Sequence, residues 1–299
     1  MKKFFKRWDL PVVALIFASL ICLFYKQVIF FDEMFIKRDI GRYYHPLRLL
    51  IRRIFESGSF PFWNPYLFCG LPLFATLQSC TLYPFSILYY FGDFSRMFNV
   101  FVLFHVFLAG FWMYVLMKEL GLSRLASFFS AFTFAFSGYM ISAINLTISL
   151  SGAAWFPLLL FAYKRAHDSV RARTRGWYLW SVLAAITLLL MLLAGDPAIV
   201  FISFCVLGCA AFYFFFEKLW ETRAISLKGL APFFLIVLIF GLISAFQIVP
   251  FLEFMRSTDR KAMPWWVAFS WSIPPTDLIS LVIPFFNDIN WYFGDYWQV

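Results

Sequence analysis

The chain has 299 residues, of which 63% are hydrophobic and 23% aromatic, whereas only 14% are charged. Soluble domains carry about a quarter charged residues, so this composition excludes an ordinary soluble globular protein. The formal net charge is +9. The basic residues are divided among short segments and form no continuous face for a nucleic-acid backbone, so we expect membrane lipids, not nucleic acid, as partners of this charge.

Long apolar runs follow one another along the chain, separated by basic clusters. A helix needs about 20 mostly apolar residues to cross a bilayer, where closed hydrogen-bonded elements alone are stable. The fourth run is short and contains Pro157. The pattern predicts an all-α polytopic membrane protein, a single transmembrane domain over 1–299 with about seven transmembrane helices. The predicted spans are 10–31, 97–117, 125–146, 148–163, 177–195, 197–216 and 229–252.

Lysine and arginine bias predicts the orientation. With the N-terminus in the cytoplasm, most basic residues fall on the inner side, and the short outer turns at 145–151 and 194–198 hold none. The remaining basic residues lie largely in the loop 32–96, and long loops cross a membrane regardless of charge. We therefore expect the loop 32–96 and the segment 253–299 outside the cytoplasm.

The outer loop 32–96 begins with a polar cluster, 35–46, just after the first span. From Leu47 the apolar residues recur at helical spacing with arginines between them, which predicts an amphipathic helix along the membrane surface, ended by Gly58. Three prolines then interrupt residues 61–72. We expect two interfacial helices in this loop, at about 40–57 and 80–91, joined by the proline-rich segment.

Several blocks of this sequence resemble YfhO-type bacterial membrane proteins. In the first outer loop these are Asp39 with Tyr43-Tyr44-His45-Pro46, Gly58 to Tyr66, Gly70-Leu71-Pro72, and Gln78 through Tyr83-Pro84. Two later blocks are Ala194-Gly195-Asp196-Pro197, where the family often has histidine before the proline, and Gln247-Ile248-Val249-Pro250 with Glu253, Ser257 and Arg260.

The resemblance implies a GT-C-type glycosyltransferase in the bacterial plasma membrane. Such an enzyme moves a sugar from a polyprenyl-phosphate carrier to an extracytoplasmic acceptor, such as a cell-envelope polymer. An acidic residue of the first outer loop is then catalytic, and by motif position this is Asp39. Family members are usually longer, so we expect residues 1–299 to be the N-terminal part of a longer chain.

The physical chemistry of sugar transfer suits the same residues. A base must take the proton of the acceptor hydroxyl, and cations must meet the negative charge that develops on the departing phosphate. Asp39 can supply the base, and arginine suits bidentate phosphate contact. The candidate residues for binding substrate or lipid phosphate are Arg38, Arg42, Tyr43, His45, Arg48, Asn64, Gln78, Asp196, Glu253, Arg256 and Arg260.

Each assignment has an alternative. The adjacent pair Asp32 and Glu33 rivals Asp39, which could instead pair with a neighbouring arginine. The arginines could simply dock lipid headgroups. His45 precedes a proline and suits a structural hydrogen bond, and Asp196 suits a turn cap.

The sequence predicts no cofactor. A divalent cation could take oxygen ligands from Asp39 with Asp32 or Glu33, but no Cys/His cluster has zinc spacing, and we predict no metal site. Cys69 and Cys80 lie in one loop and could pair, although two loop cysteines are not a disulfide framework.

The competing function is that of a lipid or polysaccharide transporter, flippase or non-catalytic envelope scaffold. Such a protein would also use outer arginines and a lipid groove, but it would tolerate loss of the Asp39 carboxylate. Mid-depth charges, which mark substrate paths in carriers, are almost lacking in the predicted spans.

Overall fold

The computed structural model describes residues 9–222, 227–258, 264–270 and 279. By internal contacts the chain divides into two units, Met1–Leu252 and Glu253–Val299. The second unit contains the last turn of α10 and the short helix α11, Trp265–Ser270. The remaining elements described below belong to the first unit.

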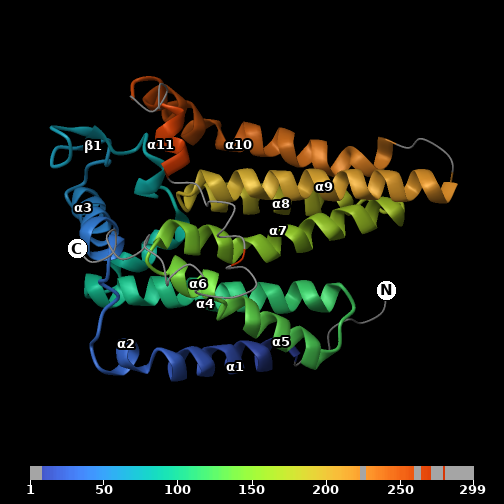
Figure 1. The fold of residues 1–299 in the computed structure, drawn as a ribbon, viewed down its shortest axis with the longest axis horizontal. Coiled ribbons are helices and arrows are strands. Elements are labelled where there is room, and N and C mark those ends of the chain that lie inside the picture. The colour runs from blue at the N-terminus through green and yellow to red at the C-terminus, as the bar shows by residue number, and fades with distance from the viewer. Residues whose placement is uncertain (1–8, 223–226, 259–263, 271–278, 280–299) are drawn as a thin grey trace. The chain divides into compact units, whose positions relative to one another are not determined.

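Long helices make up most of the first unit (Figure 1). They are α1 (Asp9–Phe24), α2 (Lys26–Phe30), α4 (Phe94–Glu119), α5 (Arg124–Ala135), α6 (Gly138–Ala143), α7 (Thr147–Arg171), α8 (Trp177–Leu193), α9 (Pro197–Thr222) and α10 (Ala231–Arg256). Most of the described residues are thus helical, as the apolar runs predicted.

Four helical stretches of the described chain are long and apolar enough to cross a membrane: Phe94–Glu119, Arg124–Ala143, Pro197–Glu217 and Ala231–Arg256. Two shorter apolar helices cover Leu10–Phe24 and Trp177–Leu193. These helices fit a membrane protein, whereas seven spans and the orientation remain predictions.

Three of the predicted spans differ clearly from the helices of the structure. The run 10–31 is interrupted at Tyr25, between α1 and α2. The run 125–146 is broken at Phe136, and Ser137 begins a new helix by accepting a hydrogen bond from the backbone N–H of Met140. The fourth run is longer than predicted, because α7 continues through Pro157 to Arg171. Its polar last turns are helical, although hydropathy assigned them to a loop.

The core of the first unit lies where α4, α7 and α8 pack together. Small buried residues, among them Ala109, Ala154, Ala162, Ala184 and Ala185, line these contacts. Alanines allow helix axes to approach closely, which is how membrane helices gain packing energy. The loop 32–96 lies at the end of the bundle where α4 begins (Figure 1).

The loop 32–96 contains short elements of its own. A π-helical turn η1 (Ile40–Tyr44) leads into α3 (His45–Glu56), and Gly58, at φ +77°, follows the end of α3. A two-residue antiparallel ribbon pairs β1 (Trp63–Asn64) with β2 (Leu71–Pro72). Two 3₁₀ segments complete the loop, η2 (Leu77–Ser79) and η3 (Pro84–Tyr90). Whether α3 and η3 lie along a membrane surface remains a prediction.

Candidate functional site

Asp39 lies at the start of η1 and is exposed. Within the described part of the chain its carboxylate makes no hydrogen bond or ion pair. Tyr44 lies close to it: burial raises the pKa of Tyr44, and the Asp39 carboxylate raises that pKa further.

The rival carboxylates lie in a different environment. Asp32 forms an ion pair with Arg96 at 2.7 Å, and both side chains are exposed. The backbone carbonyl of Glu33 accepts a hydrogen bond from the Asn99 side chain at 2.9 Å. Asp32 and Glu33 line a pocket of about 330 Å³ together with Arg96 and Asn99, and Asp39 is not among its lining residues.

A second pocket, of about 580 Å³, combines cationic and apolar residues along one side of α3. Arg42 and Arg53 supply the charge, and Tyr43 supplies a hydroxyl. The apolar part of the lining comprises Pro46, Leu47, Leu49, Leu50, Ile54 and Leu67. Its size lies within the range of ligand sites, and Arg42 lies only three residues after Asp39. We call this cavity the Arg42 pocket.

Asn64 lines the Arg42 pocket, but its side chain is buried and its carbonyl oxygen accepts a hydrogen bond from the backbone N–H of Tyr66 at 2.9 Å. This is an Asx turn that fixes the ribbon connection. Among the candidates, Asn64 therefore has a structural role in the described loop.

Arg48, in α3, is buried, whereas the candidate Arg42, in η1, is exposed. Its guanidinium donates to the carbonyl oxygens of Gln78, at 2.8 Å, and Ser79, and to the Cys80 sulfur at 2.8 Å. The loop at 78–80 is thus held to α3 through one arginine. The Gln78 side chain is exposed.

Cys80 joins the loop to the Ala194–Pro197 turn. Its thiol donates a hydrogen bond to the carbonyl oxygen of Ala194 at 2.9 Å. Gly195 follows at φ +103°, and a Cβ there would lie 2.7 Å from the Cys80 sulfur. Two of the sequence blocks, around Cys80 and around Asp196, therefore lie in direct contact. Cys80 and Cys69 are both free thiols.

Both carboxylate oxygens of Asp196 have protein partners. One accepts from the Ser149 hydroxyl at 2.5 Å, and the other accepts from the backbone N–H of Ala198 at 3.0 Å. The second bond caps the start of α9. These contacts agree with the alternative in which Asp196 caps a turn.

His45 also has structural partners. Its Nε2 lies 3.3 Å from the Ser95 hydroxyl, and its ring packs against Phe94 and Phe98. Burial lowers the pKa of His45, although the nearby Asp93 carboxylate raises it. These contacts dock the start of α3 on α4.

The third sequence block is described only in part. The side chain of Gln247, in α10, donates to the carbonyl oxygen of Phe74 at 3.0 Å and so links this helix to the loop 32–96. Glu253 and Arg256 belong to the second unit. Arg260 lies outside the described residues.

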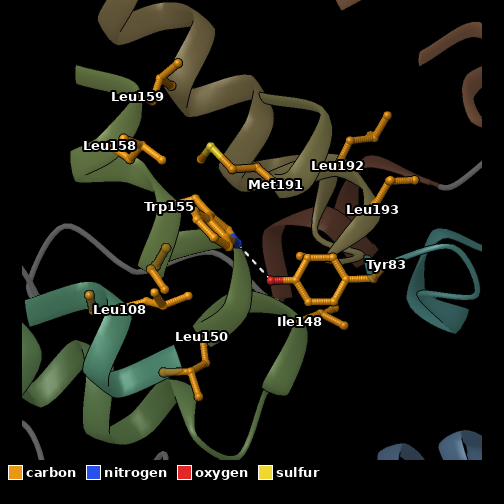
Figure 2. Packing of buried hydrophobic residues seen from close by; sticks show 14 of the residues in the cluster. Tyr83, Leu108, Ile148, Leu150, Trp155, Leu158, Leu159, Met191, Leu192 and Leu193 are labelled. Carbon is orange, nitrogen blue, oxygen red and sulfur yellow. Dashed lines mark hydrogen bonds between the residues drawn. The ribbon is translucent and has the colours of Figure 1, made fainter. Parts of the chain in front are cut away.

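A buried polar network that the sequence analysis did not foresee lies beneath the loop. The Nδ1–H of His105 donates to the Phe101 carbonyl at 2.7 Å, so its Nε2 accepts the Tyr83 hydroxyl proton at 2.6 Å. The indole N–H of Trp155 donates to the same hydroxyl at 2.8 Å (Figure 2). One loop residue is thereby bonded to both α4 and α7. The isolated histidine within an apolar run was the available signal.

Among the residues that the structure describes, no group of three or more His, Cys, Asp or Glu side chains is placed to hold a metal ion. Comparison with protein-family models, characterised proteins and solved structures finds no match to this chain.

Proposed function

We propose that this protein is a membrane glycosyltransferase of the bacterial plasma membrane, with its active face outside the cytoplasm. It would transfer a sugar from a polyprenyl phosphate to an acceptor such as a cell-envelope polymer. The observation that carries the proposal is the Arg42 pocket, in which two arginines and a set of apolar side chains share one lining. Asp39 is not part of that lining but lies three residues before Arg42, is exposed, and makes no hydrogen bond or ion pair among the described residues.

In the proposed reaction Asp39 removes the proton from the acceptor hydroxyl. The resulting oxygen attacks the anomeric carbon of the sugar, and the bond from that carbon to the phosphate oxygen breaks. The electron pair leaves with the polyprenyl phosphate, whose added charge Arg42 and Arg53 would stabilise. The apolar wall of the pocket would hold the first part of the prenyl chain.

The environment of the carboxylates supports Asp39 over its rival Asp32. The charge of Asp32 is already compensated by Arg96 at 2.7 Å. Asp39 forms no ion pair of this kind among the described residues.

The test uses the full chain in lipid vesicles with polyprenyl-phosphate-linked radiolabelled glucose or N-acetylglucosamine and cell-envelope polymer as acceptor. Asp39→Asn should lower transfer by about 10²–10⁴-fold, and Asp32→Asn serves as the matched control. Adding EDTA in a parallel series measures any need for a divalent cation.

Near-normal transfer by Asp39→Asn, with loss in Asp32→Asn, would move the chemistry to the rival pair. If wild-type protein transfers no sugar from either donor but moves the labelled lipid between leaflets, the proposal is wrong and the flippase reading replaces it.

A further inference from the structure

A third cavity lies on another face of α3, separate from the Arg42 pocket. Arg48, Ile51 and Phe55 line it from the helix, and most residues between Ser79 and Tyr90 line it from the loop. Its volume is about 330 Å³, at the low end of the range for ligand sites. We call it the Arg48 cavity.

The Arg48 cavity contains a buried positive charge. Arg48 is 4% exposed, and in the described part of the chain no carboxylate forms an ion pair with it. Its hydrogen bonds go to two backbone carbonyls and one sulfur, and none of these partners is a carboxylate. A buried cation without an opposite charge is costly, so a negatively charged ligand would stabilise this arrangement.

Cys80 does not supply the missing negative charge. Its sulfur donates its proton to the Ala194 carbonyl, which requires the neutral thiol. Burial raises the pKa of Cys80, against the lowering effect of Arg48, so the thiol form prevails at neutral pH.

A buried hydroxyl faces the same cavity. Tyr89 is 2% exposed and lines the cavity, and its hydroxyl makes no hydrogen bond of normal geometry among the described residues. Burial raises the pKa of Tyr89, whereas the neighbouring Arg48 guanidinium lowers it through its charge and through a hydrogen-bonding contact with the hydroxyl. The hydroxyl and the guanidinium therefore lie next to each other in the cavity, and a buried hydroxyl without a well-formed hydrogen bond is unfavourable. A cation and a hydroxyl donor that share one cavity suit an oxyanion.

The rim of the Arg48 cavity is apolar and exposed. Leu82, Ile87 and Tyr90 are 37%, 58% and 36% exposed and belong to the lining. A buried cation at the base and apolar side chains at the rim match an amphiphile with an anionic head and a hydrocarbon tail.

We propose that the Arg48 cavity binds the phosphate group of a membrane lipid, held by Arg48 and the Tyr89 hydroxyl, with the lipid tail on Leu82, Ile87 and Tyr90. This site lies on a different face of α3 from the proposed reaction site. It does not depend on sugar transfer, because a protein that transferred nothing would still bind lipid phosphate here.

The test titrates the delipidated full chain in detergent with dioleoylphosphatidylglycerol, with dioleoylglycerol, and with inorganic phosphate, and counts bound molecules by native mass spectrometry. Tyr89→Phe keeps the ring and removes a hydroxyl that lacks a well-formed hydrogen bond, so it should not destabilise the protein. It should weaken phosphatidylglycerol binding about tenfold, the value of one hydrogen bond to a charged group. Tyr139→Phe, at an exposed tyrosine outside the cavity, is the matched control and should change nothing.

Arg48→Gln should weaken the same binding further, but it also removes the bonds to the loop at 78–80, so Tyr89→Phe decides the question. The proposal is overturned if dioleoylglycerol binds as tightly as phosphatidylglycerol, or if Tyr89→Phe binds like wild type. Inorganic phosphate binding with the affinity of the lipid would show a free-anion site and refute the lipid assignment. Because the readout is binding, failure of the transfer assay leaves this result unaffected.

Discussion

Substitution of Gly195 tests whether the loop 32–96 and the turn before α9 fit together as closely as their contacts indicate. Alanine at this position meets two penalties. The backbone, at φ +103°, disfavours a side chain by about 1–2 kcal/mol. The added Cβ would also lie 2.7 Å from the Cys80 sulfur and 2.9 Å from the Leu77 carbonyl oxygen, and such overpacking costs about 1–3 kcal/mol. Gly195→Ala should therefore destabilise the protein by about 2–5 kcal/mol.

Gly92 offers a matched control, because its φ is +107° and nothing lies within 4 Å of an added Cβ. Gly92→Ala should cost only the backbone part, about 1–2 kcal/mol, and any unfolded-state effect of alanine is the same in both variants. The assay is stepwise unfolding in mixed dodecylmaltoside and SDS micelles, followed by circular dichroism. Equal midpoints for the two variants would refute the close contact between Gly195 and Cys80.

Three further predictions concern individual side chains. Asn99→Ala should speed amide hydrogen exchange in residues 33–35, because the Asn99 side chain bonds two backbone groups there, at 2.9 and 3.2 Å; unchanged exchange would contradict this anchoring. Burial lowers the pKa of His45 in the folded protein below its ordinary 6.5, so the unfolded chain binds this proton more readily. The contribution of His45 to the free energy of unfolding should therefore be complete above pH 6.5 and should decrease as the pH falls below it. His45→Gln should reduce this pH dependence in the same micelle assay, and an identical slope would exclude His45 as its source. Cys80 is buried and its pKa is raised, whereas Cys69 is exposed. In single-cysteine variants Cys80 should therefore react with a maleimide at least about tenfold more slowly than Cys69, and the two rates should become equal after unfolding in SDS. Equal rates before unfolding would show that Cys80 is accessible.

The helices followed from the sequence because length and hydrophobicity are local properties. The bounds did not follow where a local cap or a tertiary contact decides them. Ser137 caps a new helix inside an apolar run. A hydropathy average over many residues does not detect a single capping serine. At the other end of the bundle Arg165 pairs with Glu119 at 2.9 Å and lies over the ring of Trp180. These contacts stabilise the last turns of α7, and hydrophobicity alone does not predict them.

The sequence indicated candidate site residues but not the contacts that they make in the structure. Arg48 was predicted to bind substrate or lipid phosphate, but its burial and its bonds to two backbone carbonyls about thirty positions away were not predicted. Every residue has a backbone carbonyl, so the sequence does not indicate which carbonyls accept a hydrogen bond from a side chain. Tyr89 was not singled out, because a tyrosine in an aromatic-rich loop is common. Only its burial without a well-formed hydrogen bond distinguishes it.

The bond between Cys80 and Ala194 has a consequence for biosynthesis. The two residues are 114 positions apart, and chains are made at about 5–20 residues per second. The ribosome thus needs about 6–23 s after adding Cys80 before Ala194 exists. Gln247, which bonds to Phe74, is 173 positions further along the chain. The loop 32–96 is therefore synthesised well before Ala194 and Gln247, two of the residues that hold it, and it lacks these bonds while most of the helical bundle is still being made.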